Sequence, residues 1–166
     1  MGEAIKTRRT SSQELTHYYW EGEEFSSATG GWVTGIVGSE ASLSKESDHL
    51  FASANGQNAD FEQRMALWVT DNLIDLTEIN ILYIEWENTG DTVDSNRSYF
   101  IAGGTKNGNT GSFDVRLEKL NTFNKTIETI DVSALTGNYY IRCGCRDSSS
   151  VVNSNAQVKI YKIYGI

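Results

Sequence analysis

Proline is absent from the 166-residue sequence, and so are the features that mark an exported or membrane-spanning chain. No apolar run approaches the roughly 20 residues that a membrane-spanning helix needs. The N-terminal residues lack the apolar core of a secretory signal peptide. We therefore expect a protein that folds in the cytosol, without a membrane partner. Glycines, with many asparagines and serines, must form the turns that proline would otherwise shape.

Cysteine and histidine are also scarce, which argues against both a disulfide and a metal centre. Cys143 and Cys145 are one residue apart, so on a strand they share a face at a separation too long for an easy disulfide. We expect reduced thiols. His17 and His49 lie far apart in the sequence, whereas zinc needs several ligands in one place. We predict no metal and no cofactor, although the oxygen-rich loop 91–96 leaves calcium binding open.

Basic residues are few: 14 lysines and arginines stand against 22 aspartates and glutamates, and the formal net charge is −8. A nucleic-acid-binding surface must be basic to displace phosphate counterions, so we expect no nucleic-acid partner. The charge is uneven, because Lys6, Arg8 and Arg9 give the first nine residues a positive excess. A basic tip on an acidic body is typical of a docking arm. We predict that Ile5, Lys6, Arg8 and Arg9 dock on a partner.

Short alternating segments separated by glycine and asparagine turns make up most of the chain. Besides the stretch 74–90, we predict strands at 30–35, 49–53, 64–70, 98–103, 112–120, 126–132, 139–146 and 157–164. This pattern predicts an all-β fold, an antiparallel β-sandwich over residues 21–166. Ser11 and Glu14 have the spacing of a capping box, so we predict a short N-terminal helical arm over residues 1–20. A frayed terminus is the alternative.

Alternation within the strands predicts which side chains are buried. The expected core set includes Trp32, Trp68, Phe113, Val115, Leu117, Tyr139, Ile141, Cys143 and Cys145. The opposite side of the strand 139–146 carries Tyr140, Arg142 and Arg146, which we expect to face water.

The stretch Glu85-Trp86-Glu87 holds the strongest candidate for a functional site. Alternation places Trp86 on the core side and Tyr83, Glu85 and Glu87 on the opposite side. Two carboxylates on one strand face have a spacing compatible with a glycosidase pair. The sequence indicates no pocket that would desolvate either carboxylate and so raise its pKa. The sequence also lacks a Gly-x-Ser-x-Gly elbow and a phosphate-binding glycine loop, so we predict no catalytic residue and no enzyme. A solvated face, a glycan contact and a subunit contact remain open for Tyr83, Glu85 and Glu87.

Several segments resemble β-sandwich domains in tail proteins of siphophages that infect Bacillus and related Gram-positive hosts. These segments are GGWV at 30–33, SKESDHL at 44–50, VTDNLIDLT at 69–77, LYIEWEN at 82–88, GNYYIR at 137–142 and KIYKIY at 159–164. The start, MGEAIKTRR, is similar to a short N-terminal arm on several small phage tail and fibre proteins.

The resemblance implies a jelly-roll-like sandwich related to carbohydrate-binding modules and to domains of phage receptor-binding proteins. It implies a virion protein of the tail tip or baseplate, made in the host cytoplasm and assembled as a homo-oligomeric ring, a trimer or hexamer. The function it favours is a structural or adaptor component that docks on other phage tail proteins through its N-terminal arm. A carbohydrate-binding module or receptor-binding accessory that recognises a host cell-wall glycan is the alternative.

Overall fold

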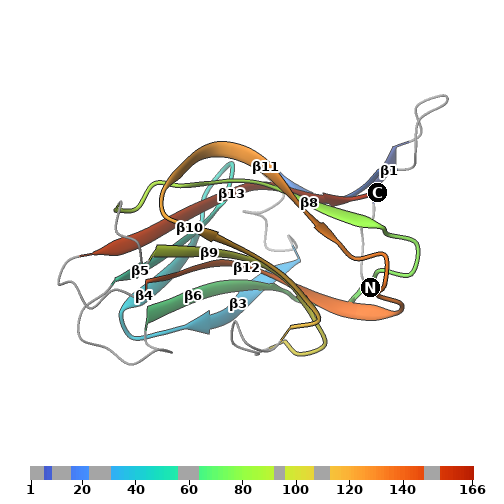
Figure 1. The fold of residues 1–166 in the computed structure, drawn as a ribbon, viewed down its shortest axis with the longest axis horizontal. Helices are drawn as coiled ribbons and strands as arrows, with labels where there is room; N and C mark the ends of the chain where they lie inside the picture. The colour runs from blue at the N-terminus through green and yellow to red at the C-terminus, as the bar shows by residue number, and fades with distance from the viewer. Residues whose placement is uncertain are drawn as a thin grey trace.

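The structure, a computed structural model, describes residues 6–8, 16–22, 31–55, 64–91, 96–106, 113–147 and 154–166. The strands in these ranges form two stacked antiparallel sheets, which appear as two layers in Figure 1. The predicted all-β sandwich is therefore confirmed. Within the same ranges, no helix is long and apolar enough to cross a membrane.

One sheet has seven strands and the other has six. The seven-stranded sheet consists of β1 (Lys6–Arg8), β2 (Thr16–Glu21), β4 (Ala41–Lys45), β5 (Leu50–Asn55), β8 (Ile81–Asn88), β11 (Phe123–Asp131) and β13 (Asn155–Gly165). The six-stranded sheet consists of β3 (Trp32–Val37), β6 (Met65–Thr70), β7 (Ile74–Asp75), β9 (Asn96–Gly103), β10 (Val115–Leu120) and β12 (Asn138–Asp147).

β13 is the central strand of the seven-stranded sheet. It pairs with β8 along one edge, and with β5 and then β2 along the other. β11 lies beyond β8, and β4 lies beyond β5. In the six-stranded sheet, β12 lies between β9 and β6, with β10 and β3 beyond them. The pairing of β8 with β13 joins two strands that are distant in the sequence, and the candidate site forms where they meet.

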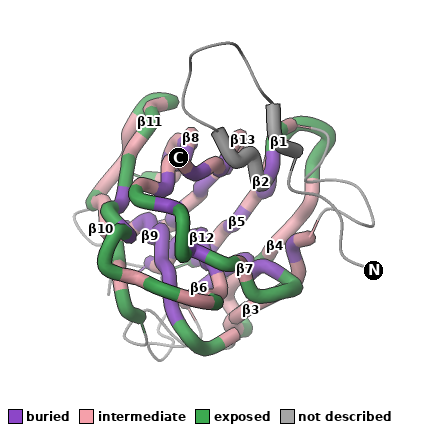
Figure 2. Tube along the Cα trace, turned by 90° about the vertical axis from the view of Figure 1, so that its right-hand side faces the viewer, coloured by how far each residue is buried: buried purple, intermediate pink, exposed green. Residues whose placement is uncertain are grey.

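The core fills the space between the two sheets. Trp86 and Ile84 of β8 pack there with Ile160 of β13, Phe100 of β9 and Ile141 of β12, and all five are fully buried. Figure 2 shows long buried stretches on β9 and β12, whereas β11 is mainly intermediate or exposed. Full burial of one large apolar side chain contributes about 1.5–3 kcal/mol, so this layer holds the two sheets together.

Most of the predicted core residues are confirmed. Trp32 and Trp68 are buried, and so are Cys143 and Cys145, which share the inner face of β12 as free thiols. Burial raises the pKa of both thiols above its ordinary value, which keeps them protonated and unreactive.

Two burial predictions are wrong. Phe113 is 42% exposed because it precedes β10, and the guanidinium of Arg116 lies 4.5 Å from the centre of its ring. Arg142 lies on the outer side of β12, as alternation predicts, but its side chain is fully buried instead of facing water.

The predicted helical arm is wrong where the structure describes it. Residues Lys6–Arg8 form β1, which pairs with β2, and β2 pairs in turn with β13. A short helix needs a surface to pack on, whereas the edge of β13 supplies backbone partners for an extended segment. β2 thus crosses the predicted boundary at residue 20. Ile5 and Arg9, like the capping-box residues Ser11 and Glu14, lie outside the described residues, so docking by Ile5, Lys6, Arg8 and Arg9 stays a prediction.

Candidate ligand-binding face

The side of the seven-stranded sheet that points away from the core carries many polar and aromatic side chains. We call this surface the polar-aromatic face and define it by Ser44, His49, Phe51, Tyr83, Glu85, Glu87, Lys125, Ile127, Lys159, Tyr161, Lys162 and Tyr164. It includes Tyr83, Glu85 and Glu87, because these alternate along β8 with the buried Leu82, Ile84 and Trp86. The prediction that these three side chains lie on the side of β8 opposite the core is therefore confirmed.

A β-bulge in β13 adds side chains to this face. The register of β13 against β8 shifts between Ile160 and Lys162. Ile160 and Ile163 are buried, while Tyr161 and Lys162 between them are both partly exposed. A bulge inserts one extra residue and re-aims the side chains that follow it. Tyr161, Lys162 and Tyr164 consequently all lie on the polar-aromatic face.

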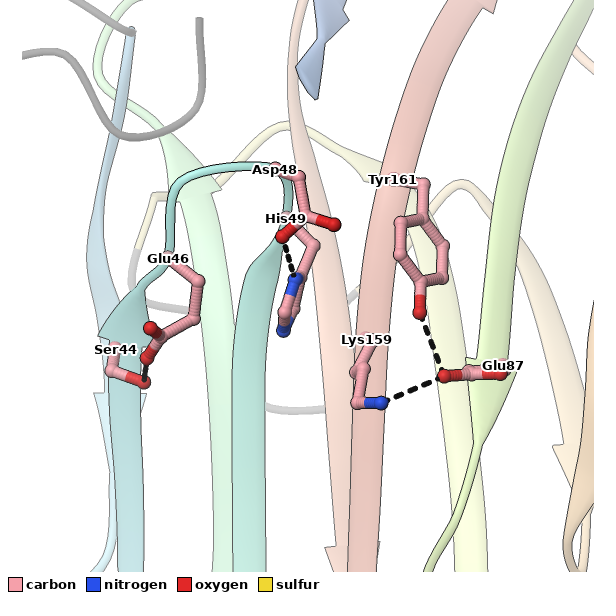
Figure 3. Close-up of polar contacts among 7 residues, drawn as sticks. All are labelled: Ser44, Glu46, Asp48, His49, Glu87, Lys159 and Tyr161. Atoms are coloured by element: carbon pink, nitrogen blue, oxygen red, sulfur yellow. Dashed lines mark hydrogen bonds and ion pairs between the residues drawn. The ribbon is translucent and has the colours of Figure 1, made fainter. Parts of the chain in front are cut away.

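Glu87 occupies the centre of a hydrogen-bonded group on this face. Its Oε1 accepts a hydrogen bond from Lys159 Nζ at 2.9 Å and another from Tyr161 Oη at 2.7 Å. Figure 3 shows both donors reaching from β13 toward Glu87 on β8. The hydrogen bond from Tyr161 lowers the pKa of Glu87 below its ordinary value, and Lys159 acts in the same direction. Glu87 is therefore ionised at neutral pH and its carboxylate is fixed in orientation.

The phenol of Tyr161 is held in place by several elements. Burial raises its pKa above the ordinary value, and the hydrogen bond to Glu87 raises it further, so the hydroxyl remains a donor. The ring centre of His49, from the turn before β5, lies 5.5 Å from that of Tyr161. Lys125 Nζ of β11 lies 3.9 Å from the centre of the same ring and 3.0 Å from Glu85 Oε1. These contacts bring three strands, β8, β11 and β13, and the turn before β5 together around one aromatic ring.

A second aromatic group lies further along the same two strands. Tyr83 and Tyr164 are direct cross-strand partners, and their rings stack with centres 4.6 Å apart and planes 5° apart. The ammonium group of Lys162 lies 5.3 Å from the centre of the Tyr164 ring. Each tyrosine covers one face of the other, so the pair adds aromatic surface to the polar-aromatic face.

The two glutamates of β8 are each held in an ion pair. Each carboxylate has its own lysine, Lys125 for Glu85 and Lys159 for Glu87. The proton donor of a glycosidase pair has a raised pKa, whereas the pKa of Glu87 is lowered, so Glu87 is not suited to that role. Fixed acceptors and donors beside aromatic surface are suited to holding hydroxyl groups.

The described residues contain no group of three or more histidine, cysteine, aspartate or glutamate side chains placed to hold a metal ion. Residues 92–95 of the loop 91–96 lie outside the described ranges, so calcium binding by that loop stays open.

The sequence identified the carboxylates of β8 but not their partners. His49, Lys125, Lys159 and Tyr161 were missed because they come from three other segments that only the sheet pairing brings together. One signal was present: Ile160 and Ile163 are three residues apart, which breaks the two-residue alternation and indicates a bulge.

Comparison with known proteins shows a likeness in fold alone. No protein-family model and no curated protein matches the sequence. The structure is similar to the K1 cleaved adhesin domain of Lys-gingipain from Porphyromonas gingivalis W83, with a TM-score of 0.53 and 14% identity over 92% of this chain and 96% of that one. This likeness shows a shared antiparallel β-sandwich.

Two carbohydrate-binding domains give weaker matches. The family 11 carbohydrate-binding module from Clostridium thermocellum, in complex with a β-1,3-1,4-mixed-linked tetrasaccharide, has a TM-score of 0.48 and 13% identity, over 82% of this chain and 88% of that one. The N-terminal cellulose-binding domain of Cellulomonas fimi β-1,4-glucanase C has a TM-score of 0.43 and 13% identity, over 86% and 93%.

Proposed function

We propose that this protein is a carbohydrate-binding module, and that its polar-aromatic face binds a neutral glycan without cleaving it. The observation that carries the proposal is the Glu87 carboxylate, held ionised by Lys159 and Tyr161 beside the rings of Tyr161 and His49. Carboxylates accept hydrogen bonds from sugar hydroxyl groups, and aromatic rings pack against the apolar side of a sugar ring.

The charge of the face favours a neutral ligand. Its acidic and basic groups form ion pairs, Lys125 with Glu85 and Lys159 with Glu87, and Lys162 pairs with the neighbouring Glu21, so neither sign dominates locally. The chain as a whole has a net charge of −8, which repels a polyanionic polymer at long range. A neutral oligosaccharide meets no such barrier and finds donors and acceptors of both kinds.

Calorimetric titration with a panel of neutral oligosaccharides tests the proposal, and the panel includes the mixed-linked tetrasaccharide of the family 11 module. Glu87→Gln removes the charge of the central acceptor, and we expect about five- to tenfold weaker binding from the loss of about 1–1.4 kcal/mol. Glu118→Gln makes the same change on the six-stranded sheet and should leave the affinity unchanged. Failure of every oligosaccharide to bind, or equal weakening by both variants, would show the proposal to be wrong.

The tail-adaptor function stays a prediction that rests on the sequence resemblance, as do the phage tail partners, the virion location and the trimer or hexamer. The mass of the protein in solution separates the two functions. A trimer or hexamer supports assembly into a ring, and a monomer supports a free-standing binding module.

A further inference from the structure

The outer face of the six-stranded sheet carries four arginines in neighbouring positions. The strand register places Arg116 and Arg142 on either side of Ile101, and it pairs Arg97 directly with Arg146. We call this surface the arginine face and define it by Arg97, Arg116, Arg142 and Arg146. It lies on the opposite side of the sandwich from the polar-aromatic face, because the two sheets turn their inner faces to a common core.

The arginines surround an apolar floor. Met65, Leu67, Tyr99 and Ile101 form a buried hydrophobic cluster that is separate from the main core. The guanidinium of Arg116 lies 5.9 Å from the centre of the Tyr99 ring. Electrostatic interactions are stronger beside such a floor than in bulk water, because the local dielectric constant is lower.

Four arginines lie here with two acids, Glu118 and Asp114, so these described residues are net positive although the whole chain is acidic. Burial lowers the pKa of Arg146, and the positive charges of Arg97 and Arg116 act in the same direction. The Glu118 carboxylate forms ion pairs with both Arg97 and Arg116. The side chains of these two arginines are 31% and 30% exposed, so a solute reaches them from solvent. An anion that reaches these guanidinium groups would form charge-assisted hydrogen bonds with them.

Gly144 leaves the centre of the arginine face without a side chain. It lies between Arg142 and Arg146 along β12 and opposite Tyr99 of β9. Its φ is +153°, and an added Cβ would stand 2.0 Å from the backbone oxygen of Ala66. Any other residue here would therefore require the strands to move apart.

We propose that the arginine face binds an oxyanion, a phosphate or sulfate group held by Arg97, Arg116 and Arg146. The planar guanidinium group presents paired donors that match two oxygens of such an anion. Glu118 already forms an ion pair with one nitrogen of Arg97 and one of Arg116, so it competes with the ligand from within the site. This site lies on the other sheet from the polar-aromatic face, and its proposed ligand is an anion instead of a neutral glycan. A test of one site therefore does not decide the other.

Amide NMR titrations of the full-length protein with inorganic phosphate and with a hexose phosphate test this site. We expect signals of Arg97, Tyr99, Arg116, Gly144 and Arg146 to shift, and the affinity to fall as sodium chloride is added. Shifts with both probes support a general oxyanion site. Shifts with the hexose phosphate alone support a site that also contacts the sugar, and the absence of shifts with either probe overturns the proposal.

Three variants separate this site from a general effect of charge. Arg116→Gln should weaken binding by about fivefold or more, through the loss of a charge-assisted hydrogen bond. Lys45→Gln removes the same charge from β4 of the opposite sheet, outside the polar-aromatic face, and should have no effect. Glu118→Gln should tighten binding, because it removes the internal competitor. Equal weakening by Arg116→Gln and Lys45→Gln overturns the proposal, and so does a folded Glu118→Gln protein that binds more weakly than the wild type.

Discussion

Replacing Tyr161 by phenylalanine tests how the Glu87 carboxylate is held. Tyr161→Phe keeps the ring but removes the hydroxyl that donates to Glu87 Oε1 at 2.7 Å. A hydrogen bond to a charged group contributes about 1.5–3 kcal/mol. The Glu87 side chain is 18% exposed and is also paired with Lys159, so screening reduces the expected loss of stability to about 1 kcal/mol. The pKa of Glu87 should rise toward its ordinary value of 4.5.

The loss of stability in Tyr161→Phe should depend on pH. The folded-state pKa of Glu87 is depressed, so its stabilisation is present above the unfolded-state pKa and is lost as pH falls through the folded-state pKa. Urea unfolding should therefore show a deficit for Tyr161→Phe at pH 7 that disappears in acid. Tyr83→Phe removes a phenol from the same face where the ring stacks on Tyr164, and it should show no such pH dependence. A deficit for Tyr161→Phe that is the same at every pH would show that Tyr161 does not stabilise the ionised form of Glu87.

Three further predictions concern stability and reactivity. Trp86→Ala should lower the free energy of unfolding by about 3–5 kcal/mol in urea titrations, because the indole is fully buried in the core; a loss below 1 kcal/mol would contradict this placement. Gly144→Ala should lower the free energy of unfolding by about 2 kcal/mol or more, because the added Cβ would strain the backbone. Gly104→Ala has open space at its Cβ and should change this free energy by at most about 0.5 kcal/mol, so equal effects of the two variants would contradict the strain at Gly144. A thiol reagent should label Cys143 and Cys145 only after unfolding, because burial raises the pKa of both thiols; rapid labelling of the native protein would contradict their burial.

The strands and their faces were largely predictable from the sequence because alternation reports burial directly. β8 follows the rule at every position, with Leu82, Ile84 and Trp86 inside and the acids outside. β4 was not predicted, because its alternating serines give a weak apolar signal in a short segment. The helical arm was predicted from the spacing of Ser11 and Glu14, which is a local signal. This spacing does not indicate that β2 pairs with β13, a strand far away in the sequence.

The candidate site was only half predictable, because it depends on which strands pair. Glu87 was identified from its own strand, but Tyr161 and Lys159 are its partners only through the β8–β13 pairing. Strict alternation would also place Lys162 and Tyr164 with the buried Ile160, and the bulge reverses this. Arg142 shows a second limit: alternation assigns a side chain to a face but does not tell whether that face is covered.

The most direct test of glycan binding by the polar-aromatic face is an amide NMR titration with the neutral oligosaccharide that binds most tightly in calorimetry. We predict that the shifted signals centre on His49, Glu87, Lys159 and Tyr161, on β8, β13 and the turn before β5. Shifts that centre instead on β6, β9 and β12 of the six-stranded sheet would contradict the account, as would the absence of any shift.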